Sequence, residues 1–320
     1  MWAELERRLG AFLGSLPPAV REIGLRQSAY TGRPGDEAFT GIGPLNPVLV
    51  GTPWHFGEIF AALPEGEFLG LAEAGALHVL ASVVADHLVD DQVERHGASV
   101  LLHQALIDGA FVRFRDLMGP DADFWSRFDS LSARHLKALA EEIEIQQSRR
   151  AVSESSLEAM AAGKVAPIVV TVTALAHRAR RVDILPGLED SLAKIAAASQ
   201  LLDDVIDWRQ DLARHHWTHF LARFPSEGWA ASESWPTEEW IEERMRAGWQ
   251  DVDALTRAGD WMAQSLAALG DLACPAWRDY VEGYSLLTTS HLNYAVAGHL
   301  REAVGAVLQA SAPPSQASAV

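Results

Sequence analysis

The chain has 320 residues, 48% of them hydrophobic, which is enough apolar surface for a buried core in one large domain or two smaller ones. Its formal net charge of −17 argues against nucleic acid as a partner, because a protein that binds the phosphate backbone presents a basic stripe. A single cysteine, Cys274, excludes an intrachain disulfide framework and favours a reducing, cytoplasmic location.

The first 62 residues predict short helices around a loop-rich segment. Residues 1–29 predict one or two amphipathic helices broken at Pro17 and Pro18, and they lack the continuous apolar core of a signal peptide. Residues 31–52 are rich in glycine and proline and predict a loop that precedes a helix near residues 54–62. The longest apolar segments of the chain carry charged or polar interruptions, so we expect no transmembrane span.

Long helices follow this segment. A 3.6-residue period of apolar positions predicts helices over residues 67–94, 99–118 and 121–150. The first of them carries Asp86 and Asp90, four residues apart, after more than two turns of apolar sequence. A spacing of four brings two side chains to the same face of a helix, so both carboxylates are expected to point the same way.

The next predicted helix covers residues 153–177 and carries Lys164. Pro167 is expected to kink this helix near its middle, because proline cannot donate the backbone hydrogen bond that the helix requires. A Pro-Gly pair at residues 186–187 predicts a turn before a central helix over residues 188–212.

The central helix contains the run SQLLDDVIDWRQD, in which Asp203, Asp207 and Asp211 are spaced four and four. On a helix such carboxylates stand about 5–6 Å apart on one face, and at a dielectric constant of about 20 two unit charges there repel by roughly 3 kcal/mol. Apolar residues surround them in the run, so we expect them to point inward and to bind a divalent cation. Oxygen ligands suit Mg²⁺ or Mn²⁺ and not zinc. The apolar residues of the run are Leu201, Leu202, Val205 and Ile206.

The two acidic stretches favour one shared site. Asp86 with Asp90, and Asp203 with Asp207, each lie on a long apolar helix, so they can face each other across a helical bundle and share a metal cluster. The alternative for the second stretch alone is a solvated acidic face, which is common in an acidic protein. The presence of both stretches favours the metal site.

The C-terminal third predicts helices over residues 238–259, 260–272 and 275–308. Residues 225–236 contain two tryptophans between prolines and predict a loop. We interpret this loop as a surface connector rather than a lid.

The sequence therefore predicts an all-α fold. Neither an internal repeat nor a strand-like alternation of useful length occurs. We expect a single helical domain over residues 1–309, and a disordered tail over the Ala-, Ser- and Pro-rich residues 310–320.

The first acidic stretch resembles a motif of the class I isoprenoid synthases, most closely of their trans-prenyl diphosphate synthase branch. In that family DDxxD is followed by RRG. Residues 86–90, DHLVD, followed by residues 95–97, RHG, are similar to this pair at the matching spacing. Histidine replaces one family residue in each element, at His87 and at His96.

Two further elements extend the resemblance over residues 70–222. The family's second motif, FQxxDDxxD, is similar to SQLLDDVID at residues 199–207, and a later Asp and Thr fall at Asp211 and Thr218. Its KTA element, which contacts diphosphate, is similar to KVA at residues 164–166.

The resemblance implies a single-domain helical bundle of the isoprenoid synthase type with a central active-site cavity. It also implies Mg²⁺ as cofactor, with Mn²⁺ as a possible replacement, an allylic prenyl diphosphate as substrate and a possible homodimer. The implied metal ligands are Asp86, Asp90, Asp91, Asp203, Asp204, Asp207 and Asp211. The implied diphosphate-binding residues are Arg95, Lys164, Gln200 and Arg214. The implied catalytic residues are Asp86, Asp90, Lys164, Asp203 and Asp207.

Several of these residues also have a purely structural interpretation. We interpret His87 as a support for neighbouring ligands rather than a ligand, while Asp91 can either replace the lost carboxylate or lie in solvent. Lys164 can extend along the surface, although its motif spacing favours a diphosphate contact. Arg214 can contact diphosphate or serve only the end of its helix, and both remain open.

The resemblance also bears on the reaction. Chain-elongating relatives carry a GGKR-like site for isopentenyl diphosphate, where this chain has Gly32 and Arg33 but no lysine. Because His96 also replaces the second arginine of RRG, the pocket for a second diphosphate looks incomplete. We interpret the chain as a terpene synthase that ionises and cyclises or rearranges one allylic diphosphate. The alternatives are a trans-prenyl diphosphate synthase and a non-catalytic partner subunit, and the retained aspartates argue against the latter.

Overall fold

The computed structural model describes residues 2–26, 50–89, 93, 95–224 and 235–310, side chains beyond residue 305 excepted. Within this part of the chain the fold is entirely helical and contains no strand, so the predicted all-α fold is confirmed. The α-helices are α1 (Trp2–Gly14), α2 (Pro18–Arg26), α3 (Thr52–His55), α4 (Glu65–Val89), α5 (His96–Met118), α6 (Ala122–Ser148), α7 (Glu154–Lys164), α8 (Ala166–Arg178), α9 (Leu185–Ala213), α10 (Glu238–Gly248), α11 (Gln250–Ala268) and α12 (Pro275–Ala310). The 3-10 helices are η1 (Val182–Ile184) and η2 (Leu221–Arg223).

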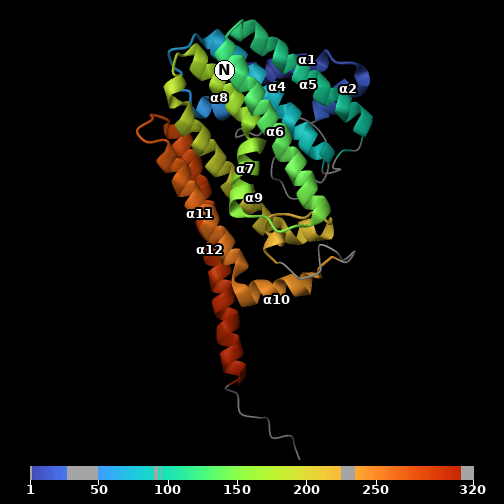
Figure 1. Ribbon diagram of the computed structural model, residues 1–320, viewed down its shortest axis with the longest axis vertical. Coiled ribbons are helices and arrows are strands. Elements are labelled where there is room, and N and C mark those ends of the chain that lie inside the picture. The colour runs from blue at the N-terminus through green and yellow to red at the C-terminus, as the bar shows by residue number, and fades with distance from the viewer. Residues whose placement is uncertain (1, 27–49, 90–92, 94, 225–234, 311–320) are drawn as a thin grey trace, which may run out of the picture.

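The two helices that carry the acidic stretches, α4 and α9, are linked through α8. α4 packs against α1, α5 and α8, while α9 packs against α7, α8 and α11. α6 packs against both α7 and α8. In Figure 1, α11 and α12 run along one side of the bundle, and α1 and α2 lie near α5 at one end. The bundle thus surrounds α4, α8 and α9 with other helices.

α4 is the core helix of the fold. Its apolar composition and length would allow it to cross a membrane, and among the described helices only the bent pair α7–α8, counted as one segment, passes the same test. Most of α4 is covered by protein, since 78% of its most apolar window is buried. A helix that is apolar on all sides is expected in the core of a bundle, which explains the composition of α4.

α4 and α8 approach each other closely at Gly75. A Cβ atom at this position would overlap with the side chain of Thr171, so the packing requires glycine. This approach holds the middle of α8 against the helix that carries Asp86.

The predicted kink at Pro167 is confirmed as a break between two helices. α7 ends at Lys164, α8 begins at Ala166, and their axes are bent by 56°. Pro167 lies in the first turn of α8, where a helix leaves backbone N–H groups without partners and the missing donor of proline does no harm. The break leaves Lys164 at the corner.

Several predicted boundaries are wrong. The Pro-Gly pair at residues 186–187 does not form a turn, because α9 already begins at Leu185 and Pro186 lies in its first turn. The break predicted between residues 259 and 260 is inside α11. The actual junction is Trp249, whose φ of 53° places it in the left-handed region and ends α10.

Other predictions are confirmed only in part. The helices predicted over residues 1–29 are α1 and α2, separated before Pro18. The helix predicted near residues 54–62 is only the single turn α3, followed by turns. The loop predictions at 31–49 and 225–234 lie outside the described residues. Ala310 still belongs to α12, and the predicted tail at 311–320 also lies outside the described part.

Candidate functional site

Asp86 and Lys164 meet where α4 and α7 end. Asp86 lies in the last turn of α4, and Lys164 is the last residue of α7. The Lys164 Nζ lies 3.0 Å from Asp86 Oδ1. Burial opposes ionisation of Asp86, but the Lys164 ammonium outweighs it and lowers the pKa of the Asp86 carboxyl. The fold thus joins a residue that the resemblance assigns to metal with one that it assigns to diphosphate.

Glu142 of α6 completes this charged cluster. Its Oε1 accepts a hydrogen bond from Lys164 Nζ at 2.7 Å, and the residue is 8% exposed. Glu142 was not among the residues predicted from the sequence, although a signal was present. Glu142 falls on the buried stripe of α6 that includes Ala138 and Ile145, and an acid at such a position indicates a buried cationic partner.

The carboxylates of Asp203, Asp207 and Asp211 lie along α9 as predicted, but not in an apolar neighbourhood. Asp203 is exposed, and so is Ile206 beside it, so the expectation that the carboxylates point inward among apolar residues is wrong there. Asp203 nevertheless has enough protein around it that burial, together with the charges of Asp207 and Asp211, raises its pKa to about 6. Burial and Asp211 also raise the pKa of Asp207, against the opposing charge of Arg214.

Asp204 has a different environment from its neighbour. It is buried, its Oδ1 accepts a hydrogen bond from Gln200 Nε2 at 2.9 Å, and its Oδ2 accepts from the backbone N–H groups of His219 and Phe220 at 3.0 and 3.4 Å. Burial raises the pKa of Asp204 to about 7, against the opposing effect of the hydrogen bond from Gln200. Both carboxylate oxygens of Asp204 accept hydrogen bonds from the protein. Asp204 therefore fixes the segment after α9 and is left out of the proposed metal ligands. The Gln200 amide, predicted to bind diphosphate, is committed to Asp204 in the same way.

The segment after α9 carries further polar groups. His216 Nδ1 lies 3.6 Å from Asp211 Oδ1, and its Nε2 lies 2.7 Å from Gln146 Nε2 of α6. Arg214, predicted to contact diphosphate, follows the last residue of α9, and its guanidinium lies 2.8 Å from the side-chain amide group of Gln210. The contact of His216 with Gln146 connects the segment after α9 to α6.

His219 is a second residue that sequence analysis missed. It is buried, and its Nε2 contacts no hydrogen-bond partner among the residues that the structure describes. Burial, and then the charges of Lys164, Arg223 and Arg150, lower its pKa to about 4, so the ring is neutral at pH 7. No sequence signal marks it, because it depends on the fold of the segment after α9.

Two predicted residues of the first motif lie outside the described part of the chain, namely Asp90 and Asp91. Arg95 is described, and its Nη1 lies 3.0 Å from Glu22 Oε2 of α2. The structure therefore gives Arg95, which the resemblance assigns to diphosphate, a protein partner at the surface.

The described residues contain no group of three or more His, Cys, Asp or Glu side chains arranged to hold a metal ion. The donor set still fits a hard divalent cation in its chemistry. Asp203 and Asp207 have raised pKa values because burial and neighbouring carboxylates disfavour their charge, and a cation bound to their oxygens would relieve both.

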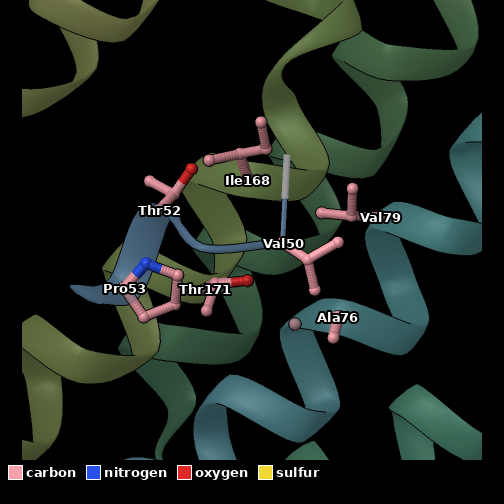
Figure 2. Close-up of a pocket in the computed structure, with 8 residues that line it drawn as sticks. Val50, Thr52, Pro53, Ala76, Val79, Ile168 and Thr171 are labelled. Carbon is pink, nitrogen blue, oxygen red and sulfur yellow. The ribbon is translucent and has the colours of Figure 1, made fainter. Parts of the chain in front are cut away.

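A small apolar pocket lies between α3, α4 and α8 (Figure 2). Its free volume of about 10 Å³ leaves room for about one water molecule. This pocket is too small for a prenyl chain, so the predicted central cavity stays a prediction. The lining residues are Val50, Thr52, Pro53, Gly75, Ala76, Val79, Ile168 and Thr171.

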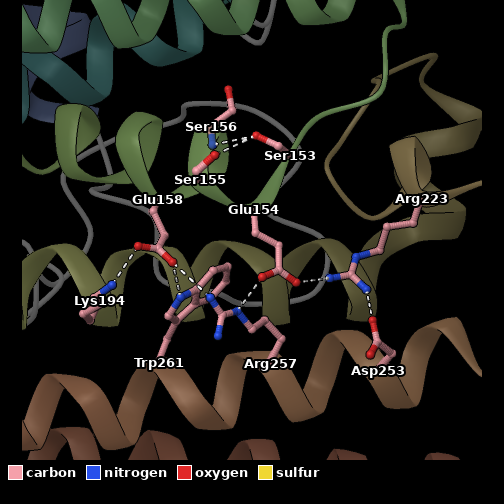
Figure 3. A network of polar contacts seen from close by, with 10 residues as sticks. All are labelled: Ser153, Glu154, Ser155, Ser156, Glu158, Lys194, Arg223, Asp253, Arg257 and Trp261. Carbon is pink, nitrogen blue, oxygen red and sulfur yellow. Dashed lines mark hydrogen bonds and ion pairs between the residues drawn. The ribbon is translucent and has the colours of Figure 1, made fainter.

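A network of polar contacts fixes α7 against α9 and α11 (Figure 3). Glu158 of α7 accepts hydrogen bonds at 2.7 Å from Lys194 of α9 and from the indole N–H of Trp261 of α11. Arg257 of α11 donates to Glu158 at 3.1 Å and pairs with Glu154 at 2.9 Å. The first half of α7, the helix that ends at Lys164, is therefore fixed by these contacts.

Comparisons with known proteins show the fold. Neither a protein family model nor a curated protein sequence matches the chain. Among solved structures, the chain is similar to octaprenyl pyrophosphate synthase from Helicobacter pylori, with a TM-score of 0.66, 13% identity and coverage of 88% of this chain and 97% of that chain. It is also similar to polyprenyl synthetase from Streptomyces coelicolor A3(2), with a TM-score of 0.67, 15% identity and coverage of 90% and 97%. Heptaprenyl diphosphate synthase from Staphylococcus aureus matches with a TM-score of 0.62, 15% identity and coverage of 90% and 96%. The chain has the fold of the class I isoprenoid synthases.

Proposed function

We propose that the protein is a Mg²⁺-dependent enzyme that ionises an allylic prenyl diphosphate. The observation that carries the proposal is the contact of Asp86 with Lys164 at 3.0 Å, at the ends of two helices in an isoprenoid synthase fold. A magnesium diphosphate needs oxygen ligands for the metal and hydrogen-bond donors for the phosphate oxygens, and these residue types supply both.

Asp86, Asp203 and Asp207 would hold Mg²⁺, and the ion when bound would neutralise the diphosphate and make it a better leaving group. Lys164 donates hydrogen bonds from Nζ to a diphosphate oxygen and stabilises the negative charge that grows on it as the carbon–oxygen bond breaks. A general acid is not required, because the diphosphate departs as an anion. The other predicted ligands that stay in the proposed set are Asp90, Asp91 and Asp211.

Chain elongation is the reaction that the comparisons favour. The similar structures from Helicobacter pylori and Staphylococcus aureus carry the names of octaprenyl and heptaprenyl synthases. We therefore propose a trans-prenyl diphosphate synthase with isopentenyl diphosphate as the second substrate, ahead of the terpene synthase that the sequence favoured.

A terpene synthase remains the second candidate because of one specific contact. A second diphosphate requires further cations, and Arg95 already forms an ion pair with Glu22. Position 96 carries histidine in place of an arginine, whose planar guanidinium can donate two parallel hydrogen bonds to a phosphate group. Both features favour a reaction with a single diphosphate.

The deciding experiment incubates the purified chain with allylic diphosphates of increasing length, with and without radiolabelled isopentenyl diphosphate, in Mg²⁺. A longer, acid-labile labelled product is expected from the elongating synthase. A hydrocarbon or alcohol from the allylic substrate alone would instead support the terpene synthase. If neither substrate is consumed, the result would support the non-catalytic subunit. Asp86→Ala should abolish turnover in either enzyme.

A homodimer is also part of the proposal. Large apolar side chains are exposed on α5, including Leu101 at 59%, and on α12, including Leu286 at 73% and Tyr294 at 76%. Exposed apolar groups of this size often mark contacts between proteins. A mass in solution of twice 34.8 kDa, measured by light scattering, is the expected result, and a mass of 34.8 kDa would contradict it.

A further inference from the structure

The Lys164 ammonium lies between two carboxylates that differ in depth. The exposed fraction of the side chain is 10% for Glu142, 20% for Lys164 and 37% for Asp86. Glu142 therefore contacts Lys164 from inside the protein, and Asp86 contacts it from the side that is open to solvent. Asp86 is the partner that a ligand arriving from solvent can replace, and Glu142 is the partner that stays.

The backbone beside Lys164 is fixed against the helix that carries Glu142. A Cβ atom at Gly163 would overlap with the Cβ of Ala138, so α6 and α7 touch at this point. His135 Nδ1 lies 3.2 Å from the carbonyl oxygen of Gly163, and against a carbonyl the ring nitrogen can only donate. The lysine side chain thus starts from a defined position relative to Glu142.

We propose that Glu142 is a positioning residue that keeps the Lys164 ammonium in place when Asp86 turns to a cation and a diphosphate oxygen takes its position. The inference deepens the proposed function and rests on it, because it gives Lys164 a diphosphate to bind. Lysine is a point charge on a flexible four-carbon stem that can adopt many rotamers. The 2.7 Å hydrogen bond to a buried carboxylate restricts that freedom before the substrate arrives.

A substitution of Glu142 can either weaken or tighten diphosphate binding, and the direction separates a positioning role from a general effect of charge. Glu142 is an anion near a site for an anion, so by Coulomb's law its removal alone should tighten diphosphate binding. A positioning role predicts the opposite, because the lysine that loses Glu142 is no longer held toward the ligand. The direction of the change therefore decides between them.

The test is a double-mutant cycle in which calorimetry on the full chain measures binding of inorganic pyrophosphate in the presence of Mg²⁺. We expect Glu142→Ala and Lys164→Ala each to weaken binding by about 10-fold or more, and the double variant to bind no more weakly than Lys164→Ala alone. Glu142→Gln keeps an acceptor for the lysine and should weaken binding by only about 3-fold. If Glu142→Ala fails to fold, the sign of the effect of Glu142→Gln decides.

Glu141→Gln is the matched control, because Glu141 is adjacent on α6 but contacts Ser156 at 2.6 Å and Arg150 at 3.5 Å. Its pyrophosphate binding should stay within about 2-fold of wild type. Unchanged or tighter binding by folded Glu142 variants would overturn the positioning role and leave the proposed function intact. A wild-type chain that neither binds pyrophosphate with Mg²⁺ nor turns over a substrate would overturn the proposed function, and this inference with it.

Discussion

At the scale of single residues, Asp203 and Asp204 show how the fold divides adjacent carboxylates between two roles. Asp204 is 3% exposed and accepts three hydrogen bonds from the protein. Asp203 is exposed, and only repelling carboxylates and burial act on its pKa. Substitutions at the two positions should therefore change stability in opposite directions.

Asp203→Asn should stabilise the metal-free protein at pH 8. The folded-state pKa of about 6 lies above the reference value of 3.8, so the ionised carboxylate is disfavoured above pH 6 and this cost disappears as the pH falls toward 3.8. We expect a gain of about 1 kcal/mol at pH 8, discounted because the side chain is exposed, or about 1–2 °C in melting temperature. Thermal unfolding in EDTA at pH 8 and pH 4.5 measures the gain.

The gain should shrink at pH 4.5, where the wild-type carboxyl is largely protonated in the fold. Asp260→Asn, at an exposed position of α11, is the control and should change neither melting temperature. An equal gain at both pH values would contradict the explanation by charge repulsion.

Asp204→Ala should destabilise the protein by about 2–4 kcal/mol, because the buried N–H groups of His219 and Phe220 would lose their acceptor. Urea unfolding at pH 7 measures the change, with Asp203→Ala as the adjacent control. Similar effects of the two substitutions would contradict the division of roles between them.

At the scale of elements, the contact of α4 with α8 offers a steric test. Gly75→Ala should destabilise the protein by about 2–3 kcal/mol, because the new Cβ would overlap with Thr171. Adding Thr171→Ala should recover part of the loss. Gly66→Ala is the control on the same helix, since nothing lies within 4 Å of a Cβ there. Urea unfolding of the four proteins measures these changes, and a Gly75→Ala variant as stable as Gly66→Ala would contradict the close approach.

Sequence predicted the helices better than their ends. The break at Pro167 was predictable because proline lacks the backbone N–H group that a continuous helix needs at every position after its first turn. Pro186 lies in the first turn of α9, as Pro167 lies in the first turn of α8, so it marks the start of a helix and not the turn that the Pro-Gly pair predicted. The junction at Trp249 was not predictable, because a bulky residue rarely adopts a positive φ.

The candidate site was predictable where spacing along one helix decides it. The positions of Asp203, Asp207 and Asp211 along α9 follow from a spacing of four. The contact of Lys164 with Glu142, by contrast, depends on how α6 and α7 pack, and a single sequence does not contain that information. The hydrogen bonds that Asp204 accepts from His219 and Phe220 depend likewise on the path of the chain after α9.

At the scale of the whole molecule, the candidate site is assembled from α4, α6, α7 and α9, which other contacts hold together. The Figure 3 network fixes α7 to α9 and α11, and Arg223 pairs with Asp253 at 2.5 Å between the segment after α9 and α11. A ligand that contacts several of these helices would bind the folded state and not the unfolded chain. Binding should therefore stabilise the fold as a unit.

Mg²⁺ together with inorganic pyrophosphate should raise the melting temperature of the full chain more than either alone. The metal would relieve repulsion between Asp203 and Asp207, and the anion would offset the repulsion between the metal and the Lys164 ammonium, so each ligand needs the other. At a ligand concentration about 100 times the dissociation constant, linkage adds about 2.7 kcal/mol, or about 4–6 °C for a chain of this length. Calorimetric scans with and without EDTA measure the shift.

Zinc should not reproduce the shift in melting temperature, because the proposed ligands are all oxygen atoms. Lys164→Ala should lose most of the shift, measured relative to its own melting temperature without ligand, which is lowered because Asp86 and Glu142 lose their cationic partner. If that variant kept the full shift, pyrophosphate would bind elsewhere, and the contact of Asp86 with Lys164 would be an ion pair of the fold alone.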